Sequence, residues 1–138
     1  MNSMSYNNWL RNAPCVDVLP YEKILDFVKG KDGVMVIPAI ITAFDCAVGG
    51  DRMVEYIYLS VPEGNLPNVR NNSTDIFVDG TNARAVVDIT SHRDTKKMCR
   101  SLAGKNRLID KFCELVGYGC YAITLNGTII ALAGCYKE

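Results

Sequence analysis

The chain has 138 residues, of which 49% are hydrophobic and 22% are charged. This composition fits one folded globular domain over residues 1–138 and excludes a disordered chain. Its 15 lysines and arginines balance its 15 aspartates and glutamates. No overall field therefore attracts nucleic acid or an anionic membrane, and any electrostatic recognition has to be local.

The first elements in chain order are two short helices, so residues 1–31 are expected to be a helical N-terminal segment. Ser5–Asn12 predicts one helix, which ends before Pro14 because the residue preceding a proline is disfavoured in the α region. The second is expected to begin at Pro20 and to end at Gly30, since apolar residues recur at helical spacing between them.

The pattern then changes to that of strands. Val34–Cys46 is rich in valine and isoleucine, and Met53–Val61 alternates, so both are predicted to be long antiparallel strands joined by a turn. Pro38 inside the first of them predicts an edge position or a bulge. Pro62–Ser73 shows no periodicity and is expected to be the longest loop.

Two hairpins are predicted at Asp79-Gly80 and Asn126-Gly127, dipeptides that favour tight turns between antiparallel strands. The strands that they join are Asp75–Val78 with Ala83–Ile89, and Tyr121–Leu125 with Thr128–Cys135.

Between the hairpins, a long amphipathic helix is expected from Arg93 to about Val116. Wound at 3.6 residues per turn, it places five cations in one narrow row and apolar residues on the opposite side. We call this row the cationic stripe: Arg93, Lys97, Arg100, Arg107 and Lys111. Gly104 lies at its centre and disfavours the helix locally, so it is a candidate break point.

These elements predict an α+β domain. Residues 33–138 should form a mainly antiparallel sheet of about six strands built from hairpins, with the long helix packed across one face. The two short N-terminal helices precede the sheet.

The cationic stripe is the main functional candidate. It predicts binding to an acidic protein surface or to a phosphate-bearing ligand, with nucleic acid a less favoured partner. His92 adjoins the stripe at the helix start, where Ser91 or Asp94 would cap the helix and free amides can bind an anion. The competing interpretation is the solvent-facing side of a packed helix, although such a side usually mixes charges of both signs.

Other chemistry has weaker support. The chain has no Cys-x-x-Cys motif and no carboxylate run with the spacing of a calcium loop, so no metal or other cofactor is expected. No leader pattern opens the chain and its longest apolar run is too short for a membrane helix, which predicts a cytoplasmic protein without a membrane partner. The six cysteines are accordingly expected to be free thiols.

One stretch of about forty residues resembles the core order of the GNAT acyltransferases. Ala85–Ile89, Arg100–Gly104, Leu108–Val116 and Tyr121–Leu125 match its strand, phosphate-binding turn, helix and strand. The resemblance implies coenzyme A held around Arg93, Arg100 and Gly104. The family's Arg/Gln-x-x-Gly-x-Gly/Ala motif is incomplete, because Ala103 and Lys105 stand at its glycine positions.

The expected function is therefore that of a small non-catalytic binding protein of the inhibitor, immunity or viral or phage accessory type. It would use the cationic stripe and His92. A small GNAT-like acyltransferase is one alternative. A structural homo-oligomer that pairs through an exposed strand edge is the other.

Overall fold

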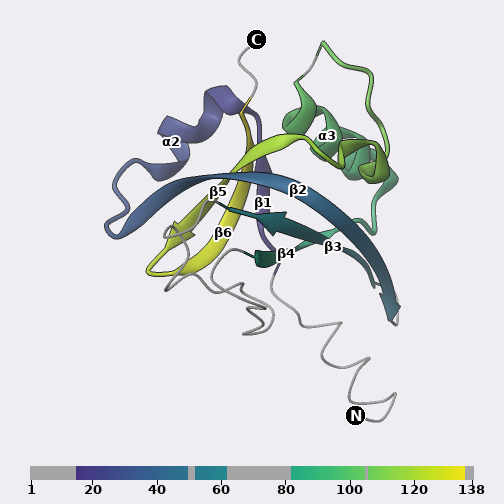
Figure 1. Cartoon of the computed structure of the whole chain (residues 1–138), viewed down its shortest axis with the longest axis horizontal. Helices are drawn as coiled ribbons and strands as arrows, with labels where there is room; N and C mark the ends of the chain where they lie inside the picture. Colours follow the sequence, from purple (N-terminus) through teal and green to yellow (C-terminus); the bar gives the residue numbers. More distant parts are fainter. Residues whose placement is uncertain (1–14, 50–51, 62–81, 105, 136–138) are drawn as a thin grey trace.

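The structure is a computed structural model that describes residues 15–49, 52–61, 82–104 and 106–135 (Figure 1). About half of these residues lie in strands. The six strands form one sheet in the order β1-β6-β5-β2-β3-β4, in which only the β1–β6 pair is parallel. They are β1 (Asp17–Leu19), β2 (Val34–Gly49), β3 (Arg52–Ser60), β4 (Asn82–Asp88), β5 (Gly119–Leu125) and β6 (Thr128–Gly134).

Helical structure is limited to short elements. A 3₁₀ turn, η1 (Tyr21–Lys23), leads into α2 (Ile24–Val28), and a second one, η2 (Phe112–Leu115), precedes β5. The longest helix is α3 (His92–Ala103). None of the helices in the described ranges is long and apolar enough to cross a membrane.

The long strand β2 makes the sheet curl. Its first part pairs with β5 over Val34–Ile40, and its second part pairs with β3 over Ile40–Gly49. A bulge at Thr42 lies near the start of the second part, and the Thr42 hydroxyl donates to the Tyr58 carbonyl at 3.2 Å. Pro38 pairs with Tyr121 of β5, and among the described strands no second strand pairs with β2 at this residue, although β2 as a whole lies inside the sheet.

The main core lies on the inner face of this curl. Alternate residues of β2 and β3, such as Ile41 and Ile57, are fully buried there against α3 and η2. From α3, Cys99 and Leu102 enter this core. The helix lies very close to β6, because a Cβ added at Gly134 would stand 2.2 Å from the Ser101 carbonyl oxygen.

The two halves of the outer face are covered differently. Over β5 and β6, the η1–α2 segment packs Ile24 against Ile123 and its neighbours. Figure 1 shows α2 in the upper part of the view. Over β3 and β4, a smaller cluster of Val54, Tyr56 and Val86 forms, and the Arg84 guanidinium lies 4.5 Å from the Tyr56 ring centroid.

The curl brings the two edges of the sheet together. The Val16 amide donates to the Val86 carbonyl at 2.8 Å, which joins the start of β1 to β4. Four antiparallel pairings separate β6 from β4, and β1 is parallel to β6, so β1 and β4 run in the same direction. We call the line along which they approach each other the seam.

The predicted fold class is wrong in its helices. The long helix ends at Ala103, because Gly104 adopts φ 95°, outside the right-handed helical region. The chain then turns, with the Arg107 amide donating to the Gly104 carbonyl at 3.0 Å. Of the two N-terminal helices, Ser5–Asn12 lies outside the described residues, and Pro20–Gly30 contains only the short η1–α2 segment.

The sheet also differs from the prediction. It is mixed rather than built from hairpins alone, because the unpredicted β1 joins β6 in parallel. The Asn126-Gly127 hairpin is confirmed, and both residues have the positive φ values, 52° and 85°, that such a turn needs. The predicted strand Asp75–Val78, its Asp79-Gly80 turn and the Pro62–Ser73 loop lie outside the described residues.

Candidate functional site

The first two turns of α3 carry exposed cations. Ser91 occupies the N-cap position without a side-chain capping bond. Arg93, Lys96 and Lys97 follow at spacings that place them on one side of the helix, and all three are exposed. None of them forms an ion pair with a described residue. We call these three residues the α3 cationic face.

The rest of the predicted cationic stripe is arranged differently. Arg100, in the last turn, pairs with Asp110, with its Nη2 atom 3.2 Å from Oδ1. Arg107 follows the helix, and its guanidinium lies 5.6 Å from the centre of the Tyr118 ring, with Nη1 3.4 Å from the hydroxyl. Lys111 is exposed at the N-cap of η2.

The five predicted residues are therefore not on one helix. Arg93, Lys97 and Arg100 share α3, whereas Arg107 and Lys111 belong to the segment between α3 and η2. His92 is the first residue of α3, and its side chain lies outside the described part of the structure.

A groove of about 620 Å³ opens at the seam beside this helix. One wall is the strand edge at residues 15–19, and a second is the end of β4 with Asp88, Thr90 and Ser91. The first turns of α3 form the third wall with Asp94, Lys97 and Met98. Its volume is in the range typical of ligand-binding clefts.

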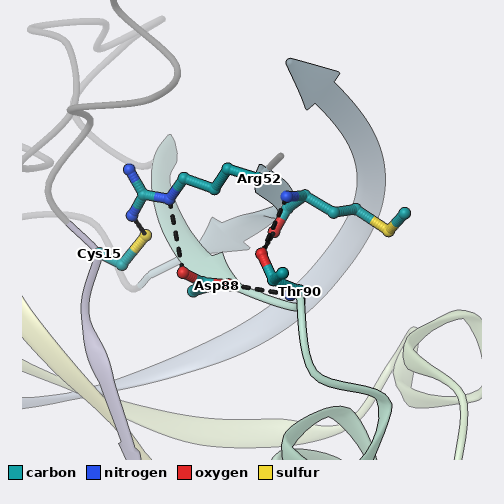
Figure 2. Close-up of polar contacts among 5 residues, drawn as sticks. Cys15, Arg52, Asp88 and Thr90 are labelled. Carbon is teal, nitrogen blue, oxygen red and sulfur yellow. Dashed lines mark hydrogen bonds and ion pairs between the residues drawn. The ribbon is translucent and has the colours of Figure 1, made fainter. Parts of the chain in front are cut away.

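A polar cluster holds one end of the seam together (Figure 2). The Arg52 guanidinium donates to the Cys15 sulfur at 2.7 Å and lies 3.4 Å from Asp88 Oδ2. Asp88 in turn accepts from the Thr90 amide at 2.8 Å, and the Thr90 hydroxyl accepts from the Met53 amide at 3.0 Å. Arg52 therefore ties the start of β1 to the end of β4.

The protonation of this cluster follows from its surroundings. Burial by itself would raise the pKa of Asp88, but its hydrogen bonds to Thr90 and the charge of Arg52 outweigh that effect and lower the pKa. Burial raises the pKa of the Cys15 thiol, and the nearby Arg52 charge offsets this only in part. Cys15 is therefore a neutral thiol at neutral pH, which is poorly suited to nucleophilic chemistry.

The six cysteines are all free thiols. Cys99 and Cys120 are buried, and burial raises the pKa of each to about 12. Within the described ranges, no group of three or more histidine, cysteine, aspartate or glutamate side chains could hold a metal ion.

Glu55 is an unusual carboxylate on the inner face of β3. It is only 9% exposed, and its neighbours on that face of the strand are Met53 and the buried Ile57. Burial, with a smaller contribution from the charge of Asp45, raises the pKa of Glu55 to about 7. Because Glu55 is buried among core residues, we assign it an effect on stability.

The GNAT resemblance does not match the observed arrangement. Arg100–Gly104 forms the last turn and cap of α3 instead of a phosphate-binding turn before a helix. Leu108–Val116 holds only the short η2. The strands expected to flank these segments, β4 and β5, are separated by β3 and β2 in the sheet.

The sequence patterns did not predict the residues that meet at the seam. The signal that could have found β1 is the alternation of Val16, Asp17 and Val18, in which the valines face the core and the aspartate is exposed. Three residues of alternation are too few to predict a strand. Arg52 and Asp88, in contrast, are brought together only by the pairing of β3 with β4.

The comparisons with known proteins do not assign this chain to a family. No protein-family model matches the sequence, and neither a curated protein nor a solved structure is significantly similar to it. Function therefore has to be argued from the residues themselves.

Proposed function

We propose that this chain is a small non-catalytic binding protein, and that the α3 cationic face docks against an acidic protein surface. The observation that carries this proposal is the exposure of Arg93, Lys96 and Lys97 side by side, without an ion pair to a described residue. Uncompensated surface charges of one sign speed association with a partner of the opposite sign and select against like-charged partners.

The shape of this face favours an acidic protein over a small phosphate compound. The three cations lie on the outside of a helix, which rises by about 1.5 Å per residue. They are therefore spread along a convex ridge. A single phosphate group is normally held by donors that converge on it. A row of carboxylates on a partner can meet each cation separately.

The remaining residues of the cationic stripe have a secondary place in this proposal. Arg100 borders the α3 cationic face, but Asp110 already compensates its charge. Arg107 and Lys111 lie beyond the end of the helix, where they would contact only the margin of a docked partner, and His92 adjoins the face at its start.

The proposal is tested with a fluorescein-labelled deca-glutamate peptide as the acidic probe. We expect fluorescence anisotropy to show binding that weakens as salt rises, because screening removes exposed charge pairs. Arg93→Glu/Lys96→Glu should weaken binding by about tenfold or more, because it replaces attraction with repulsion. Neither residue lines the seam groove, so this test is specific to α3.

The matched control is Lys23→Glu/Lys29→Glu, which makes the same change in net charge at exposed positions on and just after the η1–α2 segment. Equal losses in both double variants would show only a general charge effect and would contradict the proposal. Binding of tripolyphosphate without binding of the peptide would contradict the choice of an acidic protein. Circular dichroism confirms that each variant is folded.

The structural alternative, a homo-oligomer formed by strand pairing, needs an open strand edge. The curl of the sheet leaves little edge for it, because the amide of Val16 already bonds the β4 carbonyl of Val86 and only the three residues of β1 lie beyond that bond. A sedimentation measurement that gives a dimer mass at micromolar concentration would favour this alternative.

A further inference from the structure

The seam is closed at one point and open beyond it. Val16 reaches Val86 with a backbone hydrogen bond, and Arg52 adds a side-chain tie between Cys15 and Asp88. Beyond Val16, β1 pairs with β6 on one side, and no described strand pairs with its other edge. The groove of about 620 Å³ lies along this edge.

An open strand edge that lines a groove is the arrangement used in binding by strand addition. In this mode an extended peptide forms main-chain hydrogen bonds with the edge, and alternate side chains fit the walls. The three residues of β1 span about 10 Å at 3.3 Å per residue, so the edge can take a peptide stretch of three to five residues.

The charges of the groove indicate which peptide would fit. Asp17, Asp88 and Asp94 line it, against one lysine, Lys97. Asp88 is already paired with Arg52. Asp17 and Asp94 are exposed and form no ion pair with a described residue, so their charges are available to a ligand.

We propose that the seam groove binds an extended peptide segment that carries arginine or lysine, and that this segment adds to β1 as a further strand. The proposal rests on three independent features, which are the cavity, the open strand edge and the two uncompensated carboxylates. The groove shares Lys97 with the α3 cationic face, but Arg93 and Lys96 lie outside it, and its ligand would have the opposite charge. The two proposals can therefore fail separately.

The test uses a fluorescein-labelled heptapeptide that alternates valine and arginine. We expect wild-type protein to bind it in an anisotropy titration. Asp17→Asn/Asp94→Asn should weaken binding by about tenfold, since each substitution removes a charge-assisted hydrogen bond and keeps the shape of the side chain. The matched control is Glu22→Gln/Asp26→Asn, which removes two exposed carboxylates from η1 and α2.

A second probe separates strand addition from simple charge attraction. The same peptide with N-methyl groups on alternate residues keeps its charge but loses main-chain donors, and we expect it to bind at least about tenfold more weakly. In NMR spectra, the amides of residues 17–19 should shift on binding of the unmodified peptide.

Three results would overturn the proposal. One is equal affinity for the N-methylated and unmodified peptides, and another is equal weakening by the groove variant and its control. The third is an absence of binding at millimolar peptide. Thermal melts of all variants establish that each loss reflects the groove and not unfolding.

Discussion

The two ends of the predicted cationic stripe behave differently, although they carry the same kinds of residues. At the N-terminal end, Arg93 and Lys97 are exposed on α3 and form no ion pair with a described residue. At the other end, Arg100 pairs with Asp110, and Arg107 lies over the Tyr118 ring. The first end can meet a partner, whereas the second is engaged by the protein's own side chains.

The difference between the ends arises at Gly104. Helical periodicity describes the row of cations correctly as far as Ala103, where the helix ends. Beyond that residue the chain turns back, which brings Asp110 to Arg100. A row of charges in a sequence is therefore a surface feature only as far as the helix that carries it continues.

The largest expected effect comes from adding a methyl group where α3 lies closest to β6. In Gly134→Ala, the new Cβ would stand 2.2 Å from the Ser101 carbonyl oxygen, so the helix backbone has to move. We expect a loss of about 3 kcal/mol in the free energy of unfolding, measured by urea denaturation. Gly119→Ala is the control, because its Cβ would meet the movable Cys135 sulfur at 3.1 Å. Equal losses in the two variants would contradict this account of the helix position.

Gly104→Ala tests why the two ends differ. At φ 95° a side chain is strained, and we expect a loss of about 2 kcal/mol without any gain in helix content by circular dichroism. Gly30→Ala is the matched control, with φ 76° and no atom within 4 Å of the added Cβ. A gain in helix content with unchanged stability would show that something other than this glycine ends α3.

Glu55 tests the core beneath the helix, because it lies on the inner face of β3 beside the buried Ile57. The pKa of Glu55 is about 7 in the folded protein and near 4.5 when unfolded, so the folded state holds the proton more tightly. Stability should fall as pH rises from about 4.5 to about 7, by roughly 1.5 to 3 kcal/mol; the upper figure follows from about 1.4 kcal/mol per pKa unit, and the lower one allows for screening by solvent. Glu55→Gln should remove this part of the pH dependence in urea denaturation. An unchanged slope between pH 5 and pH 8 would refute the assignment.

The smallest expected effect comes from freeing the charge of Arg100, which would make this end of the cationic stripe resemble the end at Arg93. Asp110→Asn removes the partner of Arg100, and we expect about a twofold gain in affinity for the deca-glutamate peptide. Asp26→Asn, an exposed carboxylate on α2, is the control for the change in net charge. The same gain in both variants would mean that the Arg100–Asp110 pair has no specific effect.

Local patterns in the sequence predicted most of the described strands. The Asn126-Gly127 turn and the alternation around Ile57 both depend on near neighbours, and both are confirmed by the structure. The predicted helix was too long, because a periodic pattern cannot show whether a glycine inside it takes a positive φ.

The seam could not be predicted in the same way. It depends on β1, a strand of three residues, and on its pairing with β6 at the far end of the described chain. The groove forms, and its carboxylates come together, only because the sheet curls. No local sequence pattern predicts the curl. Of the predicted site residues whose side chains the structure describes, Lys97 alone also lines this groove.

The parallel β1–β6 pair has a consequence for the order of folding. It joins Asp17 to Ala131, so a loop of more than one hundred residues must close before the pair can form. Such long-range pairings form slowly, and during synthesis this one has to wait until β6 has been made. We therefore expect a nascent chain to acquire its peptide-binding edge late, after the local hairpins have already formed.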